Sequence, residues 1–331
     1  MKKNTLEQIG NKLLEANTIL LYPHVLMDGD TLGSSVALCK ALRSIGKTCF
    51  ILIEDTIPAY LLFLDKGYCT YDIHVIEQPD VSVAVDCSDI ERFVKRHEKF
   101  LEGKNNVCLD HHLTNNYFAD FNYIDEYAAA TGEIIYHLLK VMDIEIDIEI
   151  AEAIYTAITT DTGNFQYTNT TKTSHLITAE LFDIGIDLER ISVELYQNIR
   201  HEKIRITNEV LNTTEMLYGG KADIAYVTQD MLKQTGASMD ETEGIIESLR
   251  NISGVEISAF LKENGENDIK VGFRAKTYGD VAAIAKSFGG GGHRKAAGCT
   301  LHTDLKIAKD MISSAIIKQL QKADQTAEKG K

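Results

Sequence analysis

Short apolar runs alternate with stretches of helical periodicity over the first 165 residues. Apolar runs of strand length start at Thr18, Thr48, Val81 and Asn106. Between the first two runs, apolar positions recur every three or four residues from 31 to 45, as in an amphipathic helix. Such an alternation predicts a mostly parallel sheet with helices on both faces. Further helices are predicted over residues 129–142, 148–160, 173–184 and 188–217.

The alternation starts again near residue 222. Strands are predicted over residues 224–227, 255–261 and 269–274, and helices over 242–250 and 281–288. We therefore predict an α/β protein in which a smaller C-terminal α/β domain lies across a cleft from a larger N-terminal domain. The predicted divisions are a first domain over 1–190, a helical linker over 191–215 and a second domain over 216–325. The polar residues from 321 to 331 are expected to fray.

Composition is that of a soluble globular protein. The chain has 331 residues, of which 44% are hydrophobic and 25% charged. No apolar run approaches the roughly 20 residues that span a bilayer, and no apolar targeting segment follows the first residues. We therefore expect a cytoplasmic protein without a membrane partner. The six cysteines show no close pairing and no CxxC motif, which predicts buried free thiols rather than disulfides or a zinc–thiolate site.

The net charge limits the class of partner. The 34 basic and 49 acidic residues give a formal charge of −15. Long nucleic acids are bound through many lysine and arginine contacts to phosphates, so this balance disfavours long duplexes. Short anionic ligands in a locally positive pocket remain compatible with it.

Acidic and imidazole side chains recur at the ends of the predicted elements. Taken singly, each of these motifs is explained as well by a turn or a helix cap. Together they carry more weight, because the carboxyl ends of parallel strands meet at one edge of a sheet and their side chains converge there. The residues are His24, Asp28, Asp30, Asp86, Asp110, His111, His112 and Asp161.

Such a convergence predicts bound metal ions. Five carboxylates at one point repel one another unless cations lie between them. Oxygen-rich sites with a few imidazoles suit Mn²⁺ or Mg²⁺ better than Zn²⁺. Two-metal hydrolases hold their ions about 3.5–4 Å apart and use them to activate water and to neutralise charge on a phosphoryl oxygen. Asp86, alone at the end of its strand, could be the shared ligand.

A glycine-rich segment follows the last predicted helix. Four glycines precede His293 and Arg294, and a bare backbone lets amide groups approach an anion closely. The alternative is a flexible hinge. Arg274, at the end of the preceding strand, is a second candidate phosphate ligand, although it could equally be an ordinary surface arginine. The four glycines are Gly289, Gly290, Gly291 and Gly292.

With these motifs in this order, the chain resembles the DHH phosphoesterases that carry the associated C-terminal domain. The resemblance runs from about Thr18 to His302 and rests on Asp110-His111-His112 and on the glycine-rich segment. The family includes RecJ-like nucleases, hydrolases of short oligoribonucleotides and cyclic-dinucleotide phosphodiesterases. The chain departs from the family at Leu26-Met27, where Asn-Pro is usual, and at Ala275, where Ser is frequent.

The resemblance implies a role for each motif residue. Asp110 would support the histidines, and His112 would face the scissile phosphate. Arg274, His293 and the glycines 289–292 would hold the remaining phosphate and sugar of the substrate. One manganese ion would be held by His24, Asp28 and Asp86. A second would be held by Asp30, Asp86, His111 and Asp161.

The resemblance also implies the reaction. It is a manganese-dependent hydrolysis, with Mg²⁺ as a substitute metal, of oligoribonucleotides of two to five residues to nucleoside monophosphates. The same site could convert 3′-phosphoadenosine 5′-phosphate (pAp) to AMP. One alternative is a phosphodiesterase for cyclic di-AMP or its linear product pApA, and another is a non-catalytic nucleotide sensor. The sequence leaves the preferred substrate, the cleavage polarity and a homodimeric assembly open.

Overall fold

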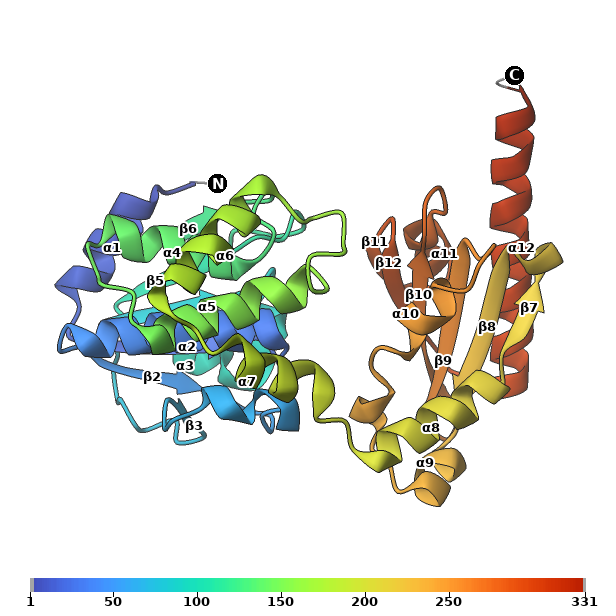
Figure 1. Ribbon diagram of the computed structural model, residues 1–331, viewed down its shortest axis with the longest axis horizontal. Coiled ribbons are helices and arrows are strands. Elements are labelled where there is room, and N and C mark those ends of the chain that lie inside the picture. Colours follow the sequence, from blue (N-terminus) through green and yellow to red (C-terminus); the bar gives the residue numbers. More distant parts are fainter. Residues whose placement is uncertain (1–2, 330–331) are drawn as a thin grey trace. The chain divides into compact units, whose positions relative to one another are not determined.

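The computed structural model describes residues 3–329, with side chains to residue 325. It separates into two compact units, one ending at Asn198 and one beginning at Ile199 (Figure 1). The division falls inside the segment predicted as a linker. In the described chain, no helix has the combination of length and apolar composition needed to cross a bilayer. All six cysteines are free, and all but Cys69 are buried.

The first unit is built on a six-stranded sheet in which every pairing is parallel. The strand order is β3-β2-β1-β4-β5-β6. All six carboxyl ends therefore lie at one edge, and this confirms the fold predicted from the alternating pattern. The strands are β1 (Thr18–Pro23), β2 (Thr48–Leu52), β3 (Cys69–Thr70), β4 (Val81–Val85), β5 (Asn105–Asp110) and β6 (Phe121–Ile124).

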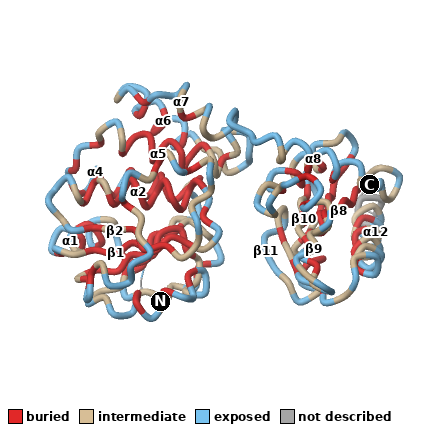
Figure 2. The backbone as a smooth tube through the Cα atoms, turned by 90° about the horizontal axis from the view of Figure 1, so that it is seen from below, coloured by how far each residue is buried: buried red, intermediate tan, exposed pale blue. Residues whose placement is uncertain are grey.

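Successive strand residues point to opposite faces of this sheet, so both faces carry apolar side chains. Helices cover both faces. Ile19 and Leu21 join the larger apolar core, whereas Leu20 and Tyr22 pack with Phe93 and Phe100 in the smaller one. The larger core contains buried residues of α1 (Leu6–Glu15), α2 (Gly29–Ser44), α4 (Thr131–Val141), α5 (Ile148–Asp161), α6 (Lys172–Ile184) and α7 (Leu188–Ser192). Figure 2 shows the buried backbone along β1, β2 and α2. The smaller core lies under a 3₁₀ segment (Ile90–Arg96) and α3 (His97–Leu101).

The second unit has its own six-stranded sheet, in the order β11-β12-β10-β9-β8-β7. Only β8 and β9 pair in parallel; the other pairings are antiparallel. The strands are β7 (Glu215–Leu217), β8 (Ala222–Val227), β9 (Ile257–Gly265), β10 (Asp268–Ala275), β11 (Gly291–His293) and β12 (Ala296–Leu301). One face packs on α8 (His201–Asn212), α9 (Gln229–Thr235) and α10 (Ile245–Arg250), and the other on α11 (Val281–Ser287) and α12 (Leu305–Lys329).

Two predictions about helices were wrong. The single helix expected over 188–217 is divided into α7, a π-helical turn (Val193–Gln197), α8 and β7. The reason is that its apolar positions serve two cores: Ile191 belongs to the first unit, and Ile206 and Val210 belong to the second. The chain end expected to fray from 321 is helical through Lys329, and residues 330–331 lie outside the described part.

The second unit buries a carboxylate that lacks hydrogen bonds. Asp223 on β8 is fully buried, and neither of its oxygens meets a hydrogen-bond partner among the described residues. Burial raises the pKa of Asp223 to about 6, although the Lys276 charge opposes this rise. The folded state therefore binds a proton more tightly than the unfolded chain, whose aspartates titrate near 4. Stability of this unit should accordingly fall as pH rises from about 4 to about 6.

Asp223→Asn is expected to stabilise the second unit by about 1–3 kcal/mol at pH 7, because it removes an unpaired buried charge. Hydrogen exchange of the β8 and β9 amides measures this unit separately from the first. The variant should also lose the decline in protection between pH 4 and 6. The exposed Asp310→Asn on α12 is the matched control. An unchanged or steeper pH dependence in Asp223→Asn would show that this carboxylate is not responsible.

Candidate metal centre and active site

The residues singled out in the first unit come together at the carboxyl edge of its sheet. His24 directly follows β1, Asp86 follows β4, and Asp110 is the last residue of β5. Asp28 caps α2 by accepting from the Thr31 backbone N–H. Asp30, His111, His112 and Asp161 complete the cluster. The sequence thus anticipated which side chains would meet in this part of the molecule.

Side chains with the spacing of metal ligands form two groups, one around His24 and one around His111. The group around His111 combines two overlapping sets, Asp86–His111–His112 and Asp30–His111–Asp161. In the first group, His24 Nε2 lies 3.5 Å from Asp28 Oδ2 and 3.5 Å from Asp86 Oδ2. Its other nitrogen, Nδ1, lies 2.8 Å from the Val25 carbonyl oxygen and therefore donates to it. In the neutral ring, Nε2 then carries a lone pair directed at two carboxylates. That arrangement is favourable only with a proton or a cation between these atoms.

The second group is centred on His111. Its Nε2 lies 3.7 Å from one oxygen each of Asp30, Asp86 and Asp161. Its Nδ1 lies 3.1 Å from the Ala128 carbonyl oxygen, which fixes the ring as in known metal sites. These 3.5–3.7 Å separations exceed hydrogen-bond length. They are close to the distance of about 3–3.5 Å between ligand atoms that share an ion at roughly 2.1 Å.

The charge balance of the cluster also fits bound cations. Among the residues that the structure describes, no lysine or arginine forms an ion pair with the four carboxylates of the two groups. Burial, together with the neighbouring Asp86, raises the pKa of Asp30 well above its usual value, and burial raises that of Asp161 to about 7. Burial would lower the pKa of His24, but Asp28 and Asp86 outweigh it and raise the value to about 10. Protons or metal ions must therefore compensate the clustered charge.

Asp161 stands where a carboxylate is unfavourable for the fold. It is the last residue of α5, at the negative end of the helix dipole. Asn169 Nδ2 lies 3.3 Å from its Oδ2 and 3.0 Å from the Ala129 carbonyl oxygen. A position that opposes the helix dipole but is held by a neighbouring amide is consistent with a role in binding rather than in stability.

Asp86 belongs to both groups. One of its oxygens faces His24 and the other faces His111. It is buried, and its backbone has a φ of 60°, which is uncommon for aspartate. The Thr131 hydroxyl donates to Asp86 Oδ1 at 2.8 Å and fixes the carboxylate. The local strain is thus associated with the one side chain that can bridge two sites.

The segment from 125 to 132 holds several of these side chains, and sequence reasoning missed it. The backbone N–H groups of Thr131 and Gly132, at the start of α4, donate to the two oxygens of Asp30 at 2.7 and 3.0 Å. The Ala128 carbonyl accepts from His111. The sequence contains one weak signal for this contact. A helix was predicted over 129–142, and the free backbone N–H groups at the start of a helix are available to bind a carboxylate.

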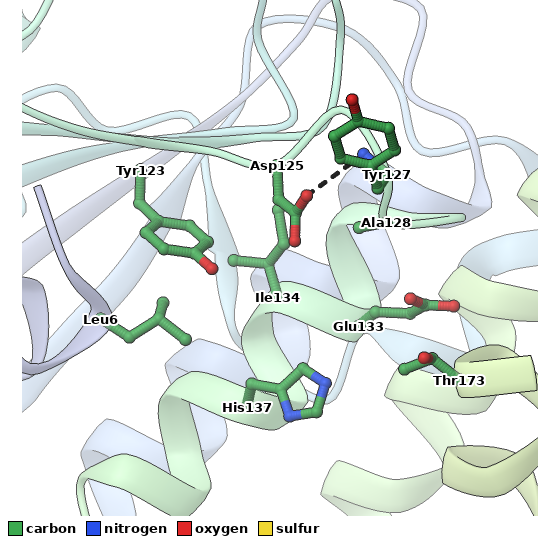
Figure 3. Close-up of a pocket in the computed structure, with 9 residues that line it drawn as sticks. All are labelled: Leu6, Tyr123, Asp125, Tyr127, Ala128, Glu133, Ile134, His137 and Thr173. Atoms are coloured by element: carbon green, nitrogen blue, oxygen red, sulfur yellow. Dashed lines mark hydrogen bonds between the residues drawn. The ribbon is translucent and has the colours of Figure 1, made fainter. Parts of the chain in front are cut away.

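A cavity of about 190 Å³ lies against the same segment (Figure 3). Ala128 lines it, as do Tyr123, Asp125, Glu133 and His137. In Figure 3, the Tyr127 ring lies at the edge of this group, with its hydroxyl directed away from Glu133 and His137, while its backbone N–H donates to Asp125 at 3.1 Å. This cavity is separate from the two ligand groups, none of whose members lines it.

His112 is oriented by a chain of hydrogen bonds. Its Nδ1 lies 2.7 Å from Asp110 Oδ1, and Asn115 Nδ2 donates to Asp110 Oδ2 at 2.7 Å. With Nδ1 committed to Asp110, Nε2 is the atom left for a ligand. Burial lowers the pKa of His112, but Asp110 and Asp86 more than compensate, so the net shift is upward. The ring is therefore easily protonated and suited to donate a hydrogen bond to an anion.

Asn115→Ala is expected to reduce kcat about 10–100-fold, the usual effect of removing a partner that orients a functional group. Asp110 would lose a charge-stabilising donor, and His112 would lose its fixed orientation. The alkaline limb of the kcat–pH profile should move if protonated His112 acts in the reaction. Asn116→Ala, one residue further and exposed, provides the control. Equal rates for both variants at every pH would rule out this role for Asn115.

In the second unit, Arg274 and His293 lie on one face of the sheet. The register pairs Arg274 with Ala296 on β12, and Ala296 with His293 on β11. Side chains in one such row point to the same side. Arg274 Nε donates to Glu247 at 2.8 Å, so the guanidinium is held in place by an ion pair. His293 is exposed and free to meet a ligand.

The glycine-rich segment is more ordered than a hinge. Gly291 and Gly292 lie in β11, paired with β12. A Cβ on Gly290 would lie 2.1 Å from the Gly298 carbonyl oxygen, and Gly292 has a φ of 134°. These two glycines are therefore required by close backbone packing. A cavity of about 680 Å³ is lined by Gly289 and Gly290 and by residues of β10 and β12.

Comparison with known proteins agrees with this arrangement. The DHH family N-terminal domain matches residues 18–158, and the DHHA1 domain matches residues 218–324. A Thermus thermophilus protein named bifunctional oligoribonuclease and PAP phosphatase NrnA is 32% identical over 308 residues, covering 92% of this chain and 91% of the relative. A Bacillus subtilis protein of the same name is 25% identical and covers 87% of this chain and 90% of the relative.

A solved structure has the same fold throughout. The crystal structure of an exopolyphosphatase-related protein from Bacteroides fragilis matches with a TM-score of 0.88 and 25% sequence identity, covering 95% of both chains. The fold and the clustered acids and imidazoles define a phosphoesterase. The chain belongs to the DHH family, in the form that combines the DHH domain with a DHHA1 domain. The resemblance inferred from Asp110-His111-His112 and the glycine-rich segment is thereby confirmed.

Proposed function

We propose that the chain is a manganese-dependent phosphodiesterase that hydrolyses oligoribonucleotides of two to five residues to nucleoside monophosphates, and that it also converts pAp to AMP. The observation that carries the proposal is the pair of ligand groups sharing Asp86, a geometry suited to two ions. The names of the Thermus and Bacillus relatives support the substrate class.

We assign the ligands as the family resemblance implies. The first ion would be held by His24, Asp28 and Asp86, and the second by Asp30, Asp86, His111 and Asp161. Bound Mn²⁺, or Mg²⁺ in its place, would polarise the phosphoryl group and activate a water molecule. Oxygen and imidazole donors without a thiolate favour these metals over Zn²⁺.

The protein's own side chains would bind and orient the substrate. His112 Nε2 would donate to a non-bridging phosphate oxygen and stabilise the charge that develops there. Asp110 would keep the His112 ring in the required tautomer. Arg274, held by Glu247, and His293 would bind a second phosphate at the glycine-rich segment of the second unit.

The test gives purified protein with Mn²⁺ three substrates in parallel: 5′-phosphorylated diadenylate (pApA), pAp and cyclic di-AMP. Products are resolved by ion-pair chromatography. Rapid AMP release from pApA and pAp, with little attack on cyclic di-AMP, would support the proposal. Fast opening of the cyclic substrate would instead indicate second-messenger turnover. Binding without product from any of the three would indicate a nucleotide sensor.

A further inference from the structure

The cavity beside the segment 125–132 contains a buried carboxylate that the metal centre does not use. Glu133 lines this cavity of about 190 Å³, and the residue is only 3% exposed. Its Oε1 atom meets no hydrogen-bond partner within the described residues. In Figure 3, the Glu133 carboxylate extends from α4 in the direction of Thr173, another lining residue. A buried carboxylate without a partner is costly, so it requires a proton or a ligand.

The charges around the cavity favour a cationic ligand. Burial, together with the charge of Asp125, raises the pKa of Glu133 to about 6, so this carboxylate is mostly ionised at pH 7. Asp125 is a second acid in the wall, and its Oδ1 accepts from the Tyr127 backbone N–H at 3.1 Å. Within the described residues, neither acid forms an ion pair, and no lysine or arginine lines the cavity. Burial lowers the pKa of His137, although Asp125 and Glu180 oppose this, so the ring carries little charge at neutral pH.

The lining favours an organic cation over a metal ion. Among the described residues, Asp125, Glu133 and His137 belong to no group of three whose ligand atoms lie within 4.8 Å of one another, so they cannot hold one ion together. Ile134 and the Tyr123 ring add apolar surface to the wall. Such a lining suits an ammonium group with a short hydrocarbon chain. At roughly 30 Å³ for each water-sized group, a volume of about 190 Å³ accommodates about six of them.

The cavity is open to small molecules from solvent. Tyr127 is 82% exposed, and His137 and Thr173 are also exposed, whereas Glu133 and Ile134 are buried. The lining therefore changes from exposed to buried across the cavity. This gives a ligand a route to the Glu133 carboxylate.

One segment connects this cavity to the metal centre. Ala128 lines the cavity, and its carbonyl oxygen accepts from His111 Nδ1 at 3.1 Å. The backbone N–H groups of Thr131 and Gly132, which precede Glu133 directly, donate to Asp30. A ligand in the cavity and the side chains of the metal centre thus contact the same short stretch of chain.

We propose that this cavity is a regulatory site for a small organic amine in its protonated form. The ammonium group pairs with Glu133, and the hydrocarbon chain packs on Tyr123 and Ile134. Occupation compensates the buried charge and holds the segment 125–133 in the arrangement that positions the metal ligands. Amine and metal therefore bind with positive coupling, and each raises the affinity for the other by the same factor. Repulsion between them is small, because the five aspartates of the metal centre outweigh the four positive charges of two divalent ions.

The experiment titrates the full chain with butylamine, without metal and with Mn²⁺, by isothermal titration calorimetry. Butan-1-ol has the same carbon chain without the charge, and KCl at equal ionic strength controls for screening. Butylamine should bind saturably and slow hydrogen exchange of the amides of residues 126–134, and neither control should reproduce this. Saturating butylamine should lower the dissociation constant of Mn²⁺ about 5-fold or more.

Variants of the cavity test which groups bind the amine. Glu133→Gln keeps the shape and removes the charge, so it should weaken butylamine binding about 10- to 150-fold and leave Mn²⁺ affinity without amine unchanged. Glu126→Gln removes an exposed carboxylate that does not line the cavity and is the matched control. Thr173→Lys adds a tethered ammonium group at the exposed end of the cavity, and it should reduce butylamine binding by competition.

Two results would overturn the proposed site: no saturable binding of butylamine to the wild-type chain, or equal affinities for wild type, Glu133→Gln and Thr173→Lys. An Mn²⁺ affinity that does not change at saturating butylamine would overturn the regulatory role. None of these measurements requires turnover, so their outcome is distinct from success or failure of the proposed hydrolysis.

Discussion

Asp86→Ala is expected to abolish hydrolysis of pApA, with kcat/KM lower by about 10³-fold or more. Removing a partner that only orients a metal ligand typically reduces activity 10–100-fold, and Asp86 is the one side chain that faces both His24 and His111. Its loss would remove a donor from both ligand groups at once. The fold should persist, because within the described residues the Asp86 side chain accepts one hydrogen bond shorter than 3.5 Å, from the Thr131 hydroxyl.

The measurement pairs steady-state kinetics with metal content. Mn²⁺ bound per chain is determined after gel filtration, and circular dichroism reports whether the fold is kept. Asp183→Ala, which removes an exposed carboxylate from α6, serves as the control. Turnover by Asp86→Ala within tenfold of wild type, or an unchanged metal content, would contradict the shared-ligand assignment.

The convergence of the acids and imidazoles could be predicted because it follows from local patterns and one geometric rule. Apolar runs identify β1, β4 and β5, and each is followed by a functional side chain. Parallel strands put those side chains at the same edge whatever the strand order. The order β3-β2-β1-β4-β5-β6 itself is set by packing between distant segments, and nothing in the periodicity encodes it.

The residues that hold the ligands could not be found in this way. Thr131 contacts Asp86 across 45 positions of sequence, and the Thr131 amide contacts Asp30 across 101. In the sequence, Asn115 cannot be distinguished from an ordinary turn asparagine. Only the structure shows that its side-chain amide donates a hydrogen bond to Asp110. Such contacts depend on how the chain folds back, whereas a threonine or asparagine in a loop is ordinary turn chemistry.

In the second unit, two secondary-structure elements could not be predicted from the sequence. Glycines have low strand propensity, so the segment 289–293 gave no sign of a strand. β11 forms because Gly291 and His293 pair with β12, which in turn pairs with β10. The long helix α12 was also missed, although Ala308, Ile312, Ile316 and Leu320 recur every four residues and are fully buried. Polar residues stand between these four positions, so the buried face of the helix does not appear as an apolar run in the sequence.

Removal of metal is expected to abolish activity and to destabilise the first unit. Wild-type protein treated with a chelator should show no hydrolysis of pApA, and readdition of Mn²⁺ should restore it. At a metal concentration 100 times the dissociation constant, binding stabilises the folded state by about 2.7 kcal/mol. For a unit of this size, that corresponds to a rise in Tm of about 5–10 °C.

The sign of the pH dependence distinguishes ligand binding from a general salt effect. Burial raises the pKa of Asp161 to about 7, and Asp86, Asp30 and Asp161 raise that of His111 to about 9 despite the opposing effect of burial. Raised values in the folded state mean that metal-free protein loses stability as pH rises through them. Metal binding requires the same groups to lose protons, so metal affinity rises over that range. The difference in Tm between the Mn²⁺-bound and metal-free protein should therefore increase from pH 5 to pH 8. A difference that is constant or absent over this range would refute the assignment of these side chains as ligands.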